Sequence, residues 1–227
     1  MTDAGDLTAH DASPTPMRQR RKAARPQELL DAALRLFAHK GFAATRIDDV
    51  ARLAGVSKGT LYLYYASKDE LFKAVVRNSL GLVIAKGSDM VDRWEGSTCD
   101  LLHQLALTWW AHVGNFEVSG IFKIVIAEVG NLPELAQFYV DEVIKPTHEL
   151  LGKAVRRGIE RGEFRPLDVN DVVHALVAPA QFLALYQHCT ARSTSNPYPL
   201  NTDTFMTTQF DLLLRGLAVA PSSKNHP

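Results

Sequence analysis

Residues 28–72 have the sequence ELLDAALRLFAHKGFAATRIDDVARLAGVSKGTLYLYYASKDELF, in which several helix signals follow one another. Leu29, Ala33, Leu36 and Phe37 recur at helical spacing, which places them on one apolar stripe. Gly41 then predicts the end of this helix, because glycine readily adopts the left-handed backbone of a helix C-terminus. The stretch therefore opens with an amphipathic helix.

Two short helices are predicted after it. Apolar residues share one face between Ile47 and Ala54, and Thr45 is placed to cap that helix. Gly55 permits a tight turn, and Ser57 is expected to cap a third helix running through Tyr64. Two short helices joined by a glycine-containing turn form the helix-turn-helix arrangement, whose second helix enters the DNA major groove.

The residue types of this third helix suit that task. Leu61 and Tyr65, four positions apart, are expected to anchor the helix to the domain. Gly59 costs about 1 kcal/mol of helix stability against alanine, which close approach to a backbone or a base would explain. The positions left to face DNA are Lys58, Gly59, Thr60, Tyr62 and Tyr64.

A longer fourth helix is predicted from Ser67 to about Gly87. Ser67 and Glu70 form a capping-box pattern, and the free N–H groups of this helix start can hold a phosphate. Because its two ends belong to different domains, it is expected to be the only element that passes a signal between them.

Charge is unevenly distributed in a chain whose formal net charge is zero. Between Arg18 and Lys68 there are eleven bases and four acids, a local balance of 11 − 4 = +7. A basic segment with an acidic remainder fits a DNA-binding module, and a solvated basic surface is the alternative. Arg18 to Arg25 are expected to precede the first helix, either as a basic arm for a minor groove or as a solvated charge run.

The whole of residues 28–72 resembles the N-terminal domain of the TetR/AcrR family of transcriptional regulators. Arg46 departs from the family, which commonly has Thr or Ser there, and Tyr65 stands where Phe is common. The resemblance implies an operator-binding homodimer that releases DNA when a small molecule enters its second domain. The shared features are Ala32-Ala33, Leu36-Phe37, Gly41-Phe42, Thr45, Ile47, Val50-Ala51, Ala54-Gly55-Val56-Ser57, Gly59-Thr60-Leu61-Tyr62, Tyr64-Tyr65, Ser67-Lys68 and Leu71.

By position, the resemblance also implies roles for individual residues. Lys58 suits contact with a base or with a phosphate. Leu63 either packs on a thymine methyl group or makes no contact. In the alternative interpretation, Tyr62 is a core aromatic. The residues nearest the base edges are Lys58, Gly59, Thr60 and Leu63. The phosphate contacts are Thr45, Arg46, Tyr62, Tyr64 and Lys68.

The expected fold is all-α, a three-helix DNA-binding domain followed by a larger helical domain. Pro146 should kink or break one of the later helices, and Gly162 should end it. Further helices are predicted over 99–115, 119–130, 133–161, 169–189 and 202–217, with a loop over 191–201. The expected divisions are a disordered leader 1–17, a DNA-binding domain 18–72, an effector-binding and dimerisation domain 73–219, and a disordered tail 220–227.

The last two predicted helices are apolar around most of their circumference, so each must be covered on more than one side. One side can pack on its own domain and the other on a second copy, as a four-helix dimer interface. Which face meets the partner is left open. The residues expected at the interface are Leu176, Phe182, Leu183, Phe210, Leu213 and Leu217.

The middle helices carry aromatic and imidazole groups that could line an effector cavity, with plain core packing as the alternative. Glu128, in an otherwise apolar helix, could face that cavity or cap a surface edge. An apolar, aromatic or acyl-bearing effector is expected. The candidate lining residues are Trp109, Trp110, His112, Phe116, Phe122, Phe138, Tyr139 and Tyr186.

No enzyme signature is visible in the sequence. The histidines lack zinc-protease spacing, Cys99 and Cys189 lack metal-ligand spacing, and there is no glycine-rich nucleotide motif. We expect no metal or cofactor, no membrane span and a cytoplasmic location. The alternatives are an enzyme targeted to DNA and a regulator with a filled core and no ligand; a turnover assay and a ligand-induced thermal shift would separate them.

Overall fold

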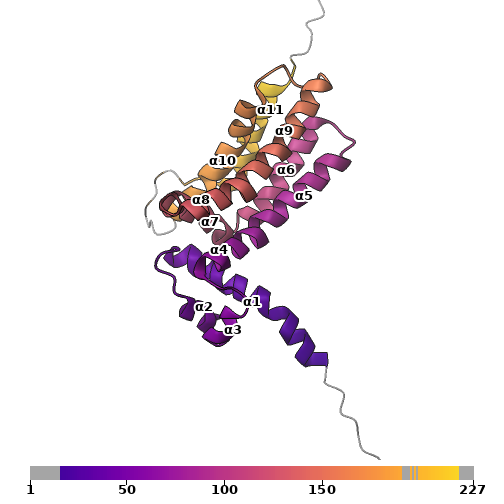
Figure 1. The fold of residues 1–227 in the computed structure, drawn as a ribbon. Coiled ribbons are helices and arrows are strands. Elements are labelled where there is room, and N and C mark those ends of the chain that lie inside the picture. The colour runs from indigo at the N-terminus through magenta and orange to yellow at the C-terminus, as the bar shows by residue number, and fades with distance from the viewer. Residues whose placement is uncertain (1–15, 191–194, 196, 198, 220–227) are drawn as a thin grey trace, which may run out of the picture.

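The computed structural model describes residues 16–190, 195, 197 and 199–219, and it is helical, with no β-strand among these residues. A small head of α1 to α3 lies at one end of an elongated molecule, and a larger helical bundle forms the other end (Figure 1). The expected all-α fold is confirmed. Of the predicted leader, residues 1–15 lie outside the description, as does the tail from 220 to 227.

The first helix is longer than expected. α1 spans Pro16–Lys40, so the bases from Arg18 to Arg25 belong to the helix and do not precede it. Pro26 lies inside this helix, where it has no N–H to donate to the preceding turn. Gly41 ends the helix at φ +86°, as predicted.

The next two helices follow the predicted pattern with one correction. α2 spans Ile47–Leu53 and α3 spans Lys58–Tyr62, joined at Gly55 with φ +67°. Ser57 caps α3 by accepting a hydrogen bond from the Thr60 amide. Thr45 is not the cap of α2, because its hydroxyl donates to the Gly41 carbonyl at 2.6 Å and Arg46 occupies the cap position.

The head is held together by a small aromatic core. Phe37, Phe42 and Phe72 have ring centroids 5.3–5.6 Å apart, and each is almost completely buried. Leu61 is fully buried beneath them in the same cluster, which confirms its predicted anchoring role. Burying side chains of this size contributes about 1.5–3 kcal/mol each, so this cluster fixes the position of α3.

The fourth helix extends beyond its predicted end. α4 (Lys68–Val76), the π-turn η1 (Arg77–Gly81) and α5 (Leu82–Arg93) follow without a break. Gly87 does not end the helix; it is buried where an added Cβ would lie 2.9 Å from Leu150 Cδ2. The π-turn leaves the Ser79 carbonyl free to accept from His112 Nε2 at 2.8 Å.

The remaining helices build the bundle. Pro146 lies at the start of α9, directly after the π-turn η3, which accommodates the missing N–H. Gly162 ends α9 with φ +68°, as predicted. The helices are α6 (Thr98–Val113), α7 (Phe116–Ala127), η2 (Val129–Asn131), α8 (Pro133–Tyr139), η3 (Val140–Ile144), α9 (Lys145–Glu160), α10 (Val169–Thr190) and α11 (Thr202–Leu217).

The last two helices pack mainly inward. Of the six residues expected at a dimer interface, four are buried in the chain's own core: Leu176, Leu183, Phe210 and Leu217. Leu213 is half-buried, and Phe182 is 49% exposed. α10 is the one described helix long and apolar enough to cross a membrane, a weak criterion that core helices also meet. It packs against α7, α9 and α11.

A second helix joins the head to the bundle. α7 packs along α1 more extensively than any other pair of elements, and Gly120 allows the close approach because an added Cβ would lie 2.7 Å from Ala38 Cβ. The bundle therefore contacts the head through α7 as well as α4, whereas the fourth helix was expected to be the only element that passes a signal between the domains. The sequence signal for the contact between α7 and α1 is Gly120 within an apolar helix. A glycine in such a helix indicates close packing but does not identify the partner helix.

Candidate DNA interface and effector cavity

The outer surface of α3 and the turn after it is unusually apolar for an exposed segment. Leu63 is 85% exposed, and Tyr62 and Tyr64 are 45% and 39% exposed. The exposure of Tyr62 excludes the alternative in which it is a core aromatic. Large apolar side chains held in solvent on a short helix mark a contact surface, and the neighbouring hydroxyls suit hydrogen bonds to phosphate.

Cations flank this surface. Arg46 is exposed at the start of α2. Lys58 is exposed at the start of α3, where its ammonium lies 2.8 Å from an Asp48 carboxylate oxygen, and this contact raises the pKa of Lys58. An exposed ion pair of this kind is worth at most about 1 kcal/mol, so a phosphate can displace Asp48.

No contact among the described residues explains why position 59 is a glycine. An alanine Cβ at this position would meet only Ser57 Oγ, at 3.8 Å, and the backbone is not in the left-handed region. Thr60 is half-buried, and its hydroxyl lies 2.8 Å from Ser57 Oγ. The open space over Gly59 faces outward with its neighbours, as a close approach to DNA requires.

Two of the residues that were expected to contact phosphate make hydrogen bonds within the head. Thr45 is 1% exposed and bonds the end of α1, which removes it from the surface. Lys68 donates to the carbonyls of Phe42 and Ala43, at 2.8 and 3.2 Å, and lies over the Phe42 ring. The lysine ties the loop before α2 to the start of α4.

The larger domain encloses a cavity of about 390 Å³, within the usual range of small-molecule sites. Its wall comes from η1, α5 to α11 and η3, and it is mostly apolar. Six lining residues carry polar side chains: Thr108, Tyr139, Thr147, His148, His174 and Gln181.

Three of the eight predicted pocket residues line this cavity: Trp109, Phe122 and Tyr139. The lining also includes His148 and His174, which were not among the eight predicted pocket residues. Burial raises the pKa of Tyr139 far above its ordinary value, so its phenol stays protonated.

The other five predicted pocket residues lie outside the lining and have local partners. Trp110 stacks on Trp109, Phe116 on His188, and Phe138 lies beneath Arg77. His112 Nε2 donates to the Ser79 carbonyl, and the Tyr186 hydroxyl accepts from the Leu200 amide at 3.3 Å.

The cavity shares its wall with the helix that leaves the head. Leu80 in η1 and Val83, Ile84 and Gly87 in α5 all line it. The facing π-turn η3 contributes Val143 and Ile144, so two irregular turns meet at the end of the cavity nearest the head. A ligand there would press on the segment that continues into α4.

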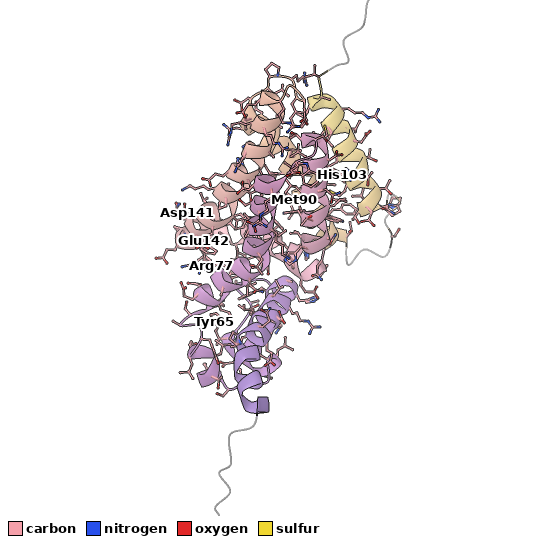
Figure 2. The ribbon with its side chains drawn as sticks, turned by 90° about the vertical axis from the view of Figure 1, so that its right-hand side faces the viewer. Tyr65, Arg77, Met90, His103, Asp141 and Glu142 are labelled. Carbon is pink, nitrogen blue, oxygen red and sulfur yellow. The ribbon has the colours of Figure 1, made fainter. Side chains whose placement is uncertain are left out.

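An ion pair closes the outside of this junction. Arg77 in η1 donates to Glu142 in η3 through Nε at 2.6 Å and also through a terminal guanidinium nitrogen (Figure 2). The guanidinium also lies 4.9 Å from the Phe138 ring centroid. The carboxylate raises the pKa of Arg77, and Arg77 lowers that of Glu142. The two π-turns are therefore bridged by a bidentate contact.

The second connection to the head uses the C-terminal end of α7. Glu128 accepts from the amides of Phe42 at 2.9 Å and Ala43 at 2.5 Å, in the loop between α1 and α2. Lys123 donates to the Ala38 carbonyl at 2.9 Å, near the end of α1. Neither alternative considered for Glu128, facing the cavity or capping a surface edge, describes this contact between domains.

Both parts of the chain match models of bacterial regulatory proteins. The family model of bacterial regulatory proteins of the tetR family matches residues 29–75, and that of tetracyclin repressor-like C-terminal domains matches residues 95–193. The HTH-type transcriptional repressor KstR2 of Mycobacterium tuberculosis is 30% identical over 161 residues, 70% of this chain and 78% of the relative. The family models and this relative are named as transcriptional regulators.

Solved structures agree in fold. The ketosteroid transcriptional regulator KstR2 of Mycobacterium tuberculosis superposes with a TM-score of 0.61 at 25% identity, covering 86% of this chain and 95% of that one. FadR from Bacillus subtilis, solved in complex with stearoyl-CoA, gives a TM-score of 0.71 at 19% identity, covering 84% and 98%. Within the described residues, no group of three or more acidic, histidine or cysteine side chains could hold a metal ion.

Proposed function

The chain belongs to the TetR family of bacterial transcriptional regulators, and from this premise we propose that it is a ligand-released repressor. It binds palindromic operator DNA as a homodimer through α3 and leaves the operator when a small, largely apolar effector occupies the bundle cavity.

The observation that carries the proposal is the shared wall between the cavity and the helix that holds the head. Leu80, Val83 and Ile84 stand in one continuous helical segment with α4, which begins four residues after Tyr64. A ligand that displaces this wall moves α3 against its counterpart in the dimer. Half-sites in simple helix-turn-helix dimers lie about 34–36 Å apart, so a small tilt spoils the match to the operator.

Operator contact is assigned to the exposed surface of α2 and α3. Arg46, Tyr62 and Tyr64 reach phosphates, while Gly59 and Leu63 lie against bases. Lys58 exchanges Asp48 for the DNA backbone. Thr45 and Lys68 support this surface from behind and are not assigned to DNA.

The dimer is assigned to the outer faces of α10 and α11. Phe182 on α10 and Leu212 on α11 are 49% and 59% exposed, and Ala175 is a small exposed residue two turns before Phe182. A second copy would cover these side chains. Leu213 is half-buried and packs against the core of the bundle.

Cavity shape and lining support an effector with an apolar body. A 390 Å³ space with aromatic walls suits an acyl chain or fused rings. The fold relative that holds stearoyl-CoA agrees with an acyl-bearing ligand. To switch operator occupancy from 99:1 to 1:99, the effector must favour the released state by about 5.5 kcal/mol.

The test is to fill the cavity. Ala106 lines it, so Ala106→Phe should occupy its volume and abolish ligand-induced release while the protein still binds operator. Ala85→Phe, on the exposed side of α5 and outside the lining, is the matched control. Release is followed by fluorescence anisotropy of labelled operator, with ligands first selected by thermal shift. Normal release from the Ala106→Phe protein would place the effector elsewhere.

A further inference from the structure

Two imidazoles from neighbouring helices stand side by side in the wall of the cavity. His148 on α9 and His174 on α10 have ring centroids 4.7 Å apart with their planes at 67°. Both belong to the lining; His148 is half-buried, and His174 is exposed. The pair therefore lies where the cavity meets the molecular surface, between the apolar interior and water.

The rest of the lining carries no formal charge. Its titratable side chains are Tyr139, His148 and His174, and the raised pKa of Tyr139 keeps that phenol neutral. The helices α5, α6, α7 and α11 contribute only uncharged side chains. Neither imidazole hydrogen-bonds a carboxylate within the described cavity wall, so no acidic side chain of that wall competes with a ligand for their N–H groups.

Charged neighbours along the two helices lie outside the cavity. On α9, Lys145 pairs with Asp141 at 2.6 Å, and Glu149 is exposed. On α10, Asp171 is exposed one turn before His174. These groups sit in solvent and leave the electrostatics of the cavity mouth to the imidazoles.

The environment of His148 disfavours positive charge on that imidazole. Burial and the neighbouring His174 lower the pKa of His148. An anion between the rings would offset both effects, because it attracts the imidazolium form and accepts N–H hydrogen bonds from either form. Charge-assisted hydrogen bonds of this kind are about twice as strong as neutral ones.

We propose that the effector carries a single carboxylate, which His148 and His174 bind at the cavity mouth while its apolar body fills the interior. This inference rests on the proposed function of the cavity. A metal ion is the competing occupant of a histidine pair. It would find only two nitrogen ligands here, because the described lining contains no Asp, Glu or Cys.

The proposal predicts that the head group of the ligand matters as much as its hydrocarbon. Five skeletons (linear, branched, monocyclic aromatic, fused aromatic and steroid) are each prepared as carboxylate, primary amide and alcohol. Binding is measured by thermal shift and calorimetry between pH 5.5 and 8. For the skeleton that fits, the carboxylate should bind about tenfold tighter than the amide.

The pH dependence has a definite sign. A bound carboxylate favours the imidazolium form, so binding takes up protons and tightens as the pH falls through the histidine range. The amide should show no such slope. His148→Gln and His174→Gln keep an N–H donor but cannot be protonated, so each should flatten the slope for the carboxylate. His103→Gln, exposed on α6 and outside the lining, should keep it.

The outcomes separate this inference from the function on which it rests. Equal binding of carboxylate and amide, with no pH slope, would overturn the carboxylate assignment and leave the effector cavity intact. No binding by any skeleton would contradict both. Tight binding of Zn²⁺ alone, lost in both Gln variants, would identify the pair as a metal site and overturn the inference.

Discussion

Gly59→Ala should make the protein more stable and its DNA binding weaker. In the free chain the new methyl group meets only Ser57 Oγ, at 3.8 Å, and strains neither packing nor backbone. Alanine is favoured over glycine inside helices by up to about 1 kcal/mol, and Gly59 is the second residue of the five-residue α3. We therefore expect the free energy of unfolding to rise by about 0.5–1 kcal/mol.

The effect on DNA has the opposite sign. The methyl group enters the space through which α3 approaches the major groove, so it either holds the helix away or distorts its contacts. A loss of about 1–3 kcal/mol, comparable to one base contact, corresponds to about fivefold to 150-fold weaker operator binding. The assays are chemical denaturation and fluorescence anisotropy at fixed salt, since affinities depend strongly on ionic strength.

Gly130→Ala is the matched control for this prediction. Gly130 is exposed on η2, and an added Cβ meets nothing within 4 Å, but it lies outside the head. Its substitution should leave operator affinity unchanged. If Gly59→Ala binds operator as tightly as the unmodified protein, α3 does not approach DNA closely at Gly59. If it lowers stability, the open space deduced around that residue is wrong.

Four further results are expected. Glu128→Ala should lower the free energy of unfolding by about 1.5–3 kcal/mol by denaturation, because two amides lose a charged acceptor; an unchanged value would mean that the contact is not maintained in solution. Lys68→Met should destabilise the head and keep the salt slope of DNA binding, whereas a slope smaller by about one would reassign Lys68 to a phosphate. Leu212→Glu should convert a dimer to monomers in sedimentation experiments, and a monomeric unmodified protein would refute the proposed interface. Burial lowers the pKa of His188, so stability should fall as the pH drops below about 6.5, because the unfolded chain binds the proton more readily; His188→Gln should flatten this loss in pH-dependent thermal melts.

Local signals account for the parts of the fold that the sequence predicted. Ser57 and Ser67 cap their helices by side-chain contacts three residues away, and Gly41 and Gly162 end theirs with positive φ. Such features depend on a few consecutive residues. The predicted boundaries of α11 agree with the structure for the same reason, since its cap Asn201 accepts from the Thr204 amide.

Features set by distant partners were missed. Gly87 was expected to stop a helix, yet it serves close packing against Leu150, 63 positions away. Five of the eight predicted pocket residues lie outside the cavity because a helical pattern shows that an aromatic is inward but not which neighbour it meets. His148 and His174 become a pair only when α9 and α10 pack together, so neither position alone indicated a site.

The two connections between head and bundle determine how the proposed ligand switch would work. A head attached through α4 alone could swing freely about the start of that helix, and ligand binding would loosen it without choosing a direction. Here Glu128 holds the loop after α1, while η1 and α5 form the cavity wall, so the head is fixed at two separated points. A ligand that displaces η1 and α5 while Glu128 holds the loop after α1 would rotate the head about that loop. Both routes begin in helices that line the cavity, since Phe122 of α7 and Leu80 of η1 are part of its wall. Under the proposed function, a ligand of fixed shape would therefore set the angle of α3 and not merely its freedom.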